Sequence, residues 1–304
     1  MARSTELDLG LVVAGHGRHY IVETPEGRRL TCHPRGKKSD CVVGDRVHWQ
    51  LTTAGGDEGV IERIETRRNL LYRQDEWRTK SFAANLDQLL VLVAAEPVFS
   101  ESQLSRSLIA AEHAGIPACL VLNKVDLPQA TAARERLAPY RAMGYELLEL
   151  ALKARPDEAR AQLAPRLEGR STLVLGPSGT GKSTLINLMV PEARAQVGEV
   201  SQALNSGRHT TTTTQWYWLD AERRSGLIDS PGFQEFGLRQ VEAQQLPALM
   251  PDLREHAGQC RFYNCTHLHE PGCGVRAALE HGQITPSRYR IYAEIHEQLT
   301  RSLY

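Results

Sequence analysis

The sequence lacks an excess of charge of either sign, because 36 basic and 36 acidic residues leave a formal net charge of zero. Overall charge therefore gives no support for nucleic-acid binding, and an RNA partner would have to be bound through local patches. The sequence also lacks a long apolar run. The strongest one, "LDQLLVLVAA" at 86–95, is too short to span a bilayer and is typical of a buried strand.

The N-terminal stretch "MARSTELDLG" lacks the basic-then-apolar pattern of a signal peptide. Together with the missing apolar spans, this leads us to expect a cytoplasmic protein with no membrane partner. The remaining composition shows neither the bias of disordered chains nor that of disulfide scaffolds. We expect a monomer built from several soluble domains.

Cysteine is scarce, and half of it lies in one place. Of six cysteines, Cys32, Cys41 and Cys119 are scattered and are expected to be buried thiols. The other three lie beside histidines in "CRFYNCTHLHEPGC", at 260–273. In a cytosolic protein, such a cluster indicates a metal site more than disulfides.

Residues 1–70 carry short segments rich in β-branched and aromatic residues, separated by glycine-containing turns. About five such strands in this length favour a small closed barrel, with an OB fold first among the options. Basic residues lie in its turns: Arg18, Arg28, Arg29, Arg35, Lys37 and Lys38. They suggest an RNA-binding surface. A merely solvated face is the alternative, since acidic residues nearly balance them.

From 71 to 238 the pattern changes to alternating strands and helices. Buried-strand patterns at 87–96 and 116–124 flank an amphipathic helix at 100–115. Such a βαβ unit predicts a parallel sheet with helices on its faces, and a ligand at the carboxyl ends of the strands.

A phosphate-binding loop is predicted at "LVLGPSGTGKSTL", 173–185, which fits G-x-x-x-x-G-K-[ST] between a strand and a helix. Its backbone N–H groups and the following helix N-terminus suit phosphate oxygens. Lys182 should contact the β- and γ-phosphates, and Ser183 should bind Mg²⁺. The full nucleotide-binding set in this loop is Gly176, Pro177, Ser178, Gly179, Thr180, Gly181, Lys182, Ser183 and Thr184.

The quartet Asn123-Lys124-x-Asp126 follows a predicted strand and indicates guanine recognition. The Asp126 carboxylate can accept hydrogen bonds from guanine N1–H and its exocyclic amine, which adenine lacks. Asn123 would tie this loop to the phosphate loop, and the Lys124 stem would cover the base. Together with the phosphate loop, the quartet predicts GTP and GDP rather than ATP as ligands.

Two further elements complete a GTPase set. Asp229 and Gly232 in "LIDSPG" would hold Mg²⁺ and sense the γ-phosphate. The stretch "SGRHTTTTTQ", at 206–215, lies where a switch loop belongs, with Thr211 or Thr212 as the Mg²⁺ ligand. A polar turn is the alternative for this stretch.

The position that usually carries a water-orienting glutamine holds Phe233 instead, with Gln234 one residue late. We therefore predict slow intrinsic hydrolysis that depends on a partner. His209 is the candidate catalytic residue, because it is the best placed polar residue in the adjacent loop. A solvated loop histidine is the alternative.

Three thiolates and one imidazole, from Cys260, Cys265, His267 and Cys273, suit a tetrahedral structural Zn²⁺. His269 competes with His267 as the fourth ligand, and a redox or unligated cluster is the alternative to a metal site. The sequence after 239 is otherwise helical in pattern.

The order of these elements is unusual, because the guanine quartet precedes the phosphate loop. With the barrel before them and the Cys/His cluster after them, the chain resembles the bacterial ribosome small-subunit-dependent GTPase A family. The blocks that carry the resemblance are "AANLDQLLVLVAAEP", "NKVDLP", "GPSGTGKSTLIN", "GRHTTTT", "IDSPGFQEFGL" and "CTHLHEPGC".

The resemblance implies a multi-domain α/β protein: an RNA-binding OB-type β-barrel (1–70), a circularly permuted P-loop GTPase domain (71–238) and a mostly helical zinc-binding domain (239–304). It implies late maturation of the small ribosomal subunit and its rRNA, with GTP hydrolysis stimulated by that subunit. It also places one structural Zn²⁺ on the four ligands named above and the catalytic histidine on His209. The family's base-contacting loop is weakly matched, by Ala151-Leu152-Lys153.

Two other functions compete with a ribosome-assembly GTPase. One is an RNA-binding nucleotide switch with incidental slow hydrolysis, which the missing glutamine favours. The other is a P-loop ATPase or metabolite kinase, in which the guanine quartet is accidental.

Overall fold

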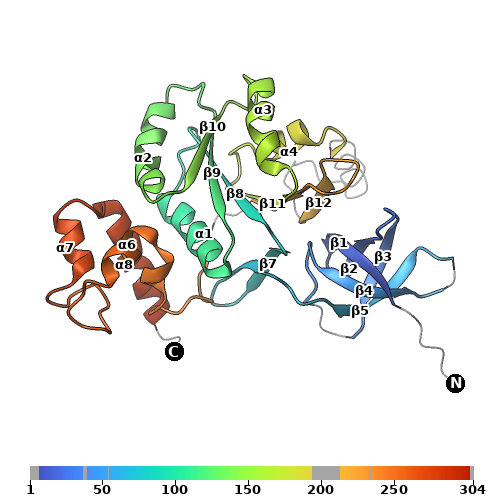
Figure 1. The fold of residues 1–304 in the computed structure, drawn as a ribbon, viewed down its shortest axis with the longest axis horizontal. Helices are drawn as coiled ribbons and strands as arrows, with labels where there is room; N and C mark the ends of the chain where they lie inside the picture. Colours follow the sequence, from blue (N-terminus) through green and yellow to red (C-terminus); the bar gives the residue numbers. More distant parts are fainter. Residues whose placement is uncertain (1–6, 37–39, 54, 194–212, 233–234, 302–304) are drawn as a thin grey trace.

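The computed structural model describes residues 7–36, 40–53, 55–193, 213–232 and 235–301. Figure 1 shows three parts in a row: a strand-only part at the N-terminal end, a central sheet with helices, and a helical part at the C-terminal end. Among the described residues, no helix has the length and apolarity needed to cross a membrane.

The N-terminal part is a closed five-stranded barrel. Its strands are β1 (Asp8–His16), β2 (His19–Glu23), β3 (Arg29–Pro34), β4 (Arg46–Leu51) and β5 (Glu58–Ile64). They follow the order β1-β2-β3-β5-β4, and β4 closes the ring by pairing with β1. Alternate side chains, such as Val22, Val47 and Trp49, fill the interior. This topology confirms the predicted OB-type barrel.

A two-stranded hairpin follows the barrel, formed by β6 (Leu70–Gln74) and β7 (Thr79–Ala84). It leads directly into β8 (Gln88–Ala94), a strand whose seven side chains are all buried. Such a buried strand, apolar except for Gln88 at its start, is typical of the centre of a parallel sheet covered on both faces.

The central sheet has the strand order β10-β9-β8-β11-β13-β12. Its strands after β8 are β9 (Ala118–Asn123), β10 (Glu146–Leu150), β11 (Ser171–Leu175), β12 (Gln215–Trp218) and β13 (Gly226–Asp229). All pairs are parallel except β12–β13. The strand β12 was not foreseen in the sequence, where its residues follow the threonine run.

Helices cover both faces of this sheet: α1 (Glu101–Ala114), α2 (Ala130–Ala142), α3 (Pro156–Leu167) and α4 (Lys182–Met189). Successive residues of β8 point to opposite faces. Leu89 and Val91 lie in the same apolar cluster as residues of α1 and α2. Leu90 and Leu92 lie in a second cluster, with residues of α3 and α4. The sheet is therefore the middle layer of a three-layer sandwich.

The barrel and the central sheet are continuous, because β1 pairs with β12 at Ala14 and Gln215. This one register pair joins all eleven strands into a single hydrogen-bonded sheet. The barrel is thus joined to the central sheet in two ways: by the covalent chain that follows β5, and by hydrogen bonding of β1 to β12.

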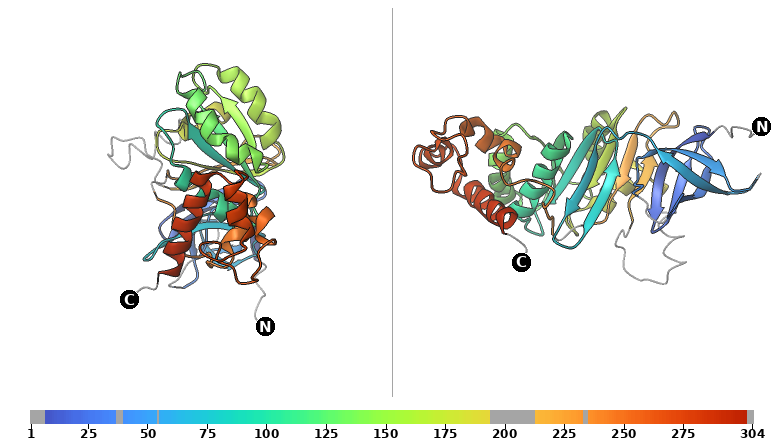
Figure 2. Two further views of the ribbon diagram at one scale, coloured as in Figure 1. Left: turned by 90° about the vertical axis from the view of Figure 1, so that its left-hand side faces the viewer. Right: turned by 90° about the horizontal axis from the view of Figure 1, so that it is seen from below.

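The C-terminal part consists of η1 (Leu246–Leu249), α6 (Pro251–Ala257), α7 (Gly274–Glu280) and α8 (Pro286–Thr300). Figure 2 shows it at the opposite end of the molecule from the barrel. Its apolar residues share a core cluster with α1. The buried Arg288 of α8 fixes the contact, since it donates to Asp252 at 2.8 and 3.0 Å and to Ser105 of α1 at 2.6 Å.

Candidate functional site

The carboxyl ends of the parallel strands converge on one cavity of about 510 Å³. β9 ends at Asn123, β10 at Leu150 and β11 at Leu175, which precedes the predicted phosphate loop. The residues lining the cavity are Asn123, Lys124, Asp126, Leu127, Leu152, Lys153, Ser178, Gly179, Gly181, Lys182, Ser183, Thr184 and Gly232. Segments far apart in the sequence thus meet at the edge where doubly wound sheets bind ligands.

Close backbone approach explains the glycines of the phosphate loop. A Cβ on Gly176 would lie 2.3 Å from the carbonyl oxygen of Leu92 in β8. Gly181 has φ +109°, and a Cβ there would lie 2.3 Å from Asn123 Nδ2. Neither position can hold a side chain without moving the loop away from its neighbours.

Lys182 begins helix α4 and is buried beneath the loop. Its Nζ donates to the carbonyl oxygens of Gly176 and Pro177, both at 2.8 Å. Burial lowers the pKa of this amine, and the charge of Asp229 opposes that effect. Gly232 lies alongside, since a Cβ on it would be 3.1 Å from Lys182 Nζ.

Asn123 connects the base-binding and phosphate-binding segments. Its Nδ2 donates to the Thr180 carbonyl at 2.8 Å, and its Oδ1 accepts from the Leu152 N–H at 3.1 Å. Lys124 has φ 62°, and its Nζ donates to the Glu96 carbonyl at 2.6 Å. Asp126 lines the cavity beyond them.

The predicted residues of the nucleotide site divide into three groups: those that line the cavity, those close to it that do not line it, and those outside the described residues. Most of them line the cavity. Gly176, Pro177 and Thr180 belong to the loop without lining it, and the buried Asp229 ends β13 behind Lys182. His209 and Thr211, together with Thr212, Phe233 and Gln234, lie outside the described residues.

Two contributors were missed by sequence reasoning. Leu127 lines the cavity one residue after Asp126, and its apolar side chain inside the quartet's block was the available signal. Glu96 holds Lys124 through a backbone carbonyl, which no side-chain pattern could reveal.

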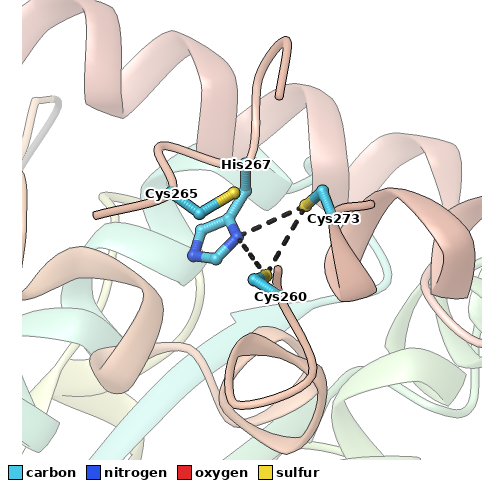
Figure 3. Close-up of side chains that lie close together, drawn as sticks. All are labelled: Cys260, Cys265, His267 and Cys273. Carbon is cyan, nitrogen blue, oxygen red and sulfur yellow. Dashed lines mark hydrogen bonds between the residues drawn. The ribbon is translucent and has the colours of Figure 1, made fainter. Parts of the chain in front are cut away.

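The second predicted site lies in the C-terminal part, where Cys260, Cys265, His267 and Cys273 bring their ligand atoms within 4.8 Å of one another (Figure 3). Cys260 Sγ and Cys273 Sγ lie 3.3 and 3.4 Å from His267 Nδ1, and 3.9 Å from each other. His269 is exposed and is not part of this group.

These separations fit a zinc ion. A tetrahedral Zn²⁺ with bonds of about 2.3 Å to sulfur and about 2.0 Å to nitrogen sets sulfur atoms about 3.8 Å apart, and sulfur and nitrogen about 3.5 Å apart. Two backbone N–H groups also point at the thiols, from Gly274 to Cys260 Sγ and from Arg276 to Cys273 Sγ. Such donors stabilise thiolates. The cluster therefore fits a zinc site in both spacing and donor chemistry.

Comparison with known proteins identifies the arrangement. A model of the RsgA GTPase family matches residues 64–239. The Small ribosomal subunit biogenesis GTPase RsgA of Variovorax paradoxus is 61% identical over 300 residues, covering 97% of this chain and 93% of its own. The chain belongs to the RsgA GTPase family. The protein of the same name from Burkholderia pseudomallei is 56% identical over 299 residues, covering 97% of this chain and 94% of its own.

Two solved structures share the fold of this chain over nearly its whole length. YjeQ from Thermotoga maritima has a TM-score of 0.74 and 29% identity, and the match covers 97% of this chain and 100% of that one. YloQ, described as a circularly permuted GTPase, has a TM-score of 0.71 and 24% identity, and it covers 100% and 99%. The family model and the curated relatives confirm the family that the sequence resembles, and the solved structures confirm the circularly permuted fold that the resemblance implied.

Proposed function

We propose that this chain is a GTP hydrolase that binds the small ribosomal subunit and acts in its late maturation, with hydrolysis stimulated by that subunit. The observation that carries the proposal is the single cavity lined by both Asp126 and Lys182. Guanine selection and phosphate binding require these two side chains in one site. The names of the similar proteins from Variovorax and Burkholderia supply the ribosomal partner.

Each segment has a role in this proposal. Asp126 accepts from the guanine edge, Asn123 holds the loops together, and the Lys124 stem covers the base. The backbone of 176–184 binds phosphate oxygens. Lys182 Nζ, which donates to two loop carbonyls in this structure, donates to phosphate oxygens instead when the nucleotide is bound. Ser183, Asp229 and Thr211 would hold Mg²⁺, which neutralises charge on the phosphates when bound. His209 orients the attacking water.

The domain division and cofactors complete the proposal. We assign RNA binding to 1–70, GTP hydrolysis to 71–238 and one structural Zn²⁺ to 239–304. A complete shell of four protein ligands leaves no open position for substrate, which favours a structural metal. We further propose a monomer that acts in the cytoplasm.

The test compares GTP and ATP turnover by the zinc-loaded protein, with and without purified small ribosomal subunits. We expect slow hydrolysis of GTP alone and strong, GTP-specific stimulation by the subunits. Equal rates with and without subunits would favour the alternative, an RNA-binding switch with incidental hydrolysis, which Phe233 at the usual glutamine position also favours. Equal turnover of ATP would contradict guanine selection.

The role of His209 is tested by His209→Ala in the same assay. We expect stimulated turnover to fall by about 10²-fold or more, as for other positioned general catalysts, while GDP affinity stays unchanged. His281→Ala, an exposed histidine in the C-terminal part, is the control and should hydrolyse GTP like the parent. Unchanged stimulation of His209→Ala would remove His209 from the mechanism.

A further inference from the structure

A second cavity, of about 580 Å³, lies at the junction of the barrel and the central sheet. It exists because the edge of β1 that faces away from β2 changes partner along its length. Residues Asp8–Leu11 pair with β4, whereas Ala14 pairs with β12. Between these pairings the barrel and β12 diverge, and the space between them stays open. This cavity shares no lining residue with the nucleotide cavity.

Two tryptophans of β12 form one wall of this cleft. Trp216 is buried and packs edge-to-face against Trp218, with ring centroids 5.1 Å apart. Trp218 is partly exposed, and its Nε1 donates to the buried Glu23 carboxylate at 2.6 Å. Because both hydrogen bonding and packing fix the indole, its ring is a preformed flat surface. Such rings stack on nucleobases.

The carboxylates of the cleft are all paired, whereas two of its arginine side chains have no partner among the described residues. Glu23 is bound by Arg29 and Trp218, and Asp87 by Arg68 and Ser171. Glu65 pairs with His48.

Arg46 and Arg224 also line the cleft. Within the described part of the chain, neither guanidinium makes a hydrogen bond or an ion pair with another residue. Both side chains are exposed. The acceptors of the cleft are therefore occupied, while two planar cations remain available for phosphate oxygens.

We propose that this cleft binds one nucleotide of a single-stranded RNA, with its base against Trp218 and its phosphates at Arg46 and Arg224. The proposal rests on the function proposed above only in taking RNA as the source of that nucleotide. A free mononucleotide offers the same base and phosphate chemistry. Trp218 lies on β12, which pairs with β13 at Gln215 and Asp229, so the base would contact the strand next to a predicted Mg²⁺ ligand.

The test measures binding of a fluorescein-labelled, mixed-sequence 12-nucleotide RNA to the full-length, zinc-loaded, GDP-bound protein by anisotropy. We expect Arg46→Ala/Arg224→Ala to bind at least about 10-fold more weakly. Because each single-strand phosphate contact contributes about 0.7 to the salt slope, the slope of log K against log salt should decrease by about 1.4. Arg46→Lys/Arg224→Lys keeps both charges and should recover most of the affinity.

The matched control is Arg134→Ala/Arg290→Ala, which removes two exposed arginines from α2 and α8, away from the barrel. It should bind RNA within about 2-fold of the parent. Trp218→Phe should retain more affinity than Trp218→Ala, because phenylalanine keeps a stacking ring. If Trp218→Ala does not fold, a 4-thiouridine-substituted RNA provides a second measurement on the parent protein, and cross-links should map to 213–224.

Equal RNA affinity of the parent and the double alanine variant would overturn the proposal. So would equal competition by an acidic peptide, or binding of free AMP, GMP or UMP in the cleft without binding of the oligonucleotide. The proposed GTPase function is measured separately, as subunit-stimulated hydrolysis by the parent. Loss of that stimulation leaves the oligonucleotide result intact, so the two failures are distinguishable.

Discussion

At the scale of single residues, Asn123 shows how one side chain can unite a site. Both polar atoms of its buried amide are used, one toward Thr180 and one toward Leu152. An aspartate could not donate to the Thr180 carbonyl, and a glutamine would be one methylene too long. Gly181 must also lack a Cβ to let this amide approach. The quartet's first residue is therefore a structural connector, and base selection is assigned to Asp126.

Asp126→Asn tests that assignment. The carboxylate is expected to accept two charge-assisted hydrogen bonds from guanine, and the amide can accept only one and places a donor against the exocyclic amine. We expect GDP affinity to fall by about 10²-fold, or about 3 kcal/mol, because one hydrogen bond is lost and the other loses its charge assistance. Affinity for xanthosine diphosphate, whose C2 carbonyl accepts from the new amide, should rise.

The measurement is a titration with fluorescent GDP and competition by xanthosine diphosphate. Asp157→Asn, an exposed carboxylate in the first turn of α3, is the control and should leave both affinities unchanged. Unchanged preference for guanine in Asp126→Asn would contradict the predicted role.

At the scale of elements, the Cys/His cluster lies in a region with little secondary structure. Between α6 and α7, residues 258–273 contain no helix or strand. Helix α8 helps to hold this segment, since Tyr289 and Tyr292 donate to the carbonyls of His267 and Thr266. Cys273 caps the seven-residue helix α7, so a predicted metal ligand also sets where that helix begins. We infer that metal binding and local folding are coupled.

The metal prediction uses the two neighbouring histidines. We expect about one zinc per chain in the parent and in His269→Ala, and loss of most zinc in His267→Ala, because only His267 Nδ1 lies among the thiols. His267→Ala should also unfold the C-terminal part at a lower temperature. Elemental analysis and circular dichroism are the measurements. Full zinc content in His267→Ala, with loss in His269→Ala, would reassign the ligand.

At the scale of the whole molecule, three buried thiols should make the free energy of unfolding depend on pH in the alkaline range. Burial raises the pKa of Cys32 to about 11 and that of Cys119 to about 12. The pKa of Cys41 is also raised, first by burial and then by the neighbouring Asp45. Unfolded thiols ionise above about pH 8.5. Above that pH the folded chain binds more protons than the unfolded chain, so its free energy of unfolding decreases as pH rises.

Between pH 9 and 10 we expect that decrease to approach about 1.4 kcal/mol per thiol, or about 4 kcal/mol in total. Urea unfolding followed by tryptophan fluorescence at each pH measures it. Cys32→Ala should reduce the slope by about one third, while Arg290→Ala, an exposed change on α8, should leave it unchanged. A pH-independent free energy of unfolding over this interval would contradict the raised pKa values.

The sequence by itself determined the motifs whose chemistry is local. The phosphate loop needs consecutive backbone groups, and the guanine quartet and the Cys/His cluster also lie within short segments. Continuous apolar runs identified β8 and β9, and the helix predicted at 100–115 agrees with α1, which Ser100 and Gly115 cap. The order of motifs, with the barrel before them and the Cys/His cluster after them, carried the resemblance that implied the circular permutation. Such a permutation is possible because a site built from strand ends does not depend on where the chain begins.

The tertiary structure alone decided what depends on contacts between distant segments. The bond from Asn123 to Thr180 spans 57 residues, and the Trp218–Glu23 bond spans 195 residues. Strand β12 has only four residues, too few for a clear periodicity, and it is fixed by pairing with β13 and β1. That pairing joins the barrel to the central sheet and creates the second cavity. Long-range pairing has no local signal, since the partner that satisfies each backbone group is chosen only when the chain folds.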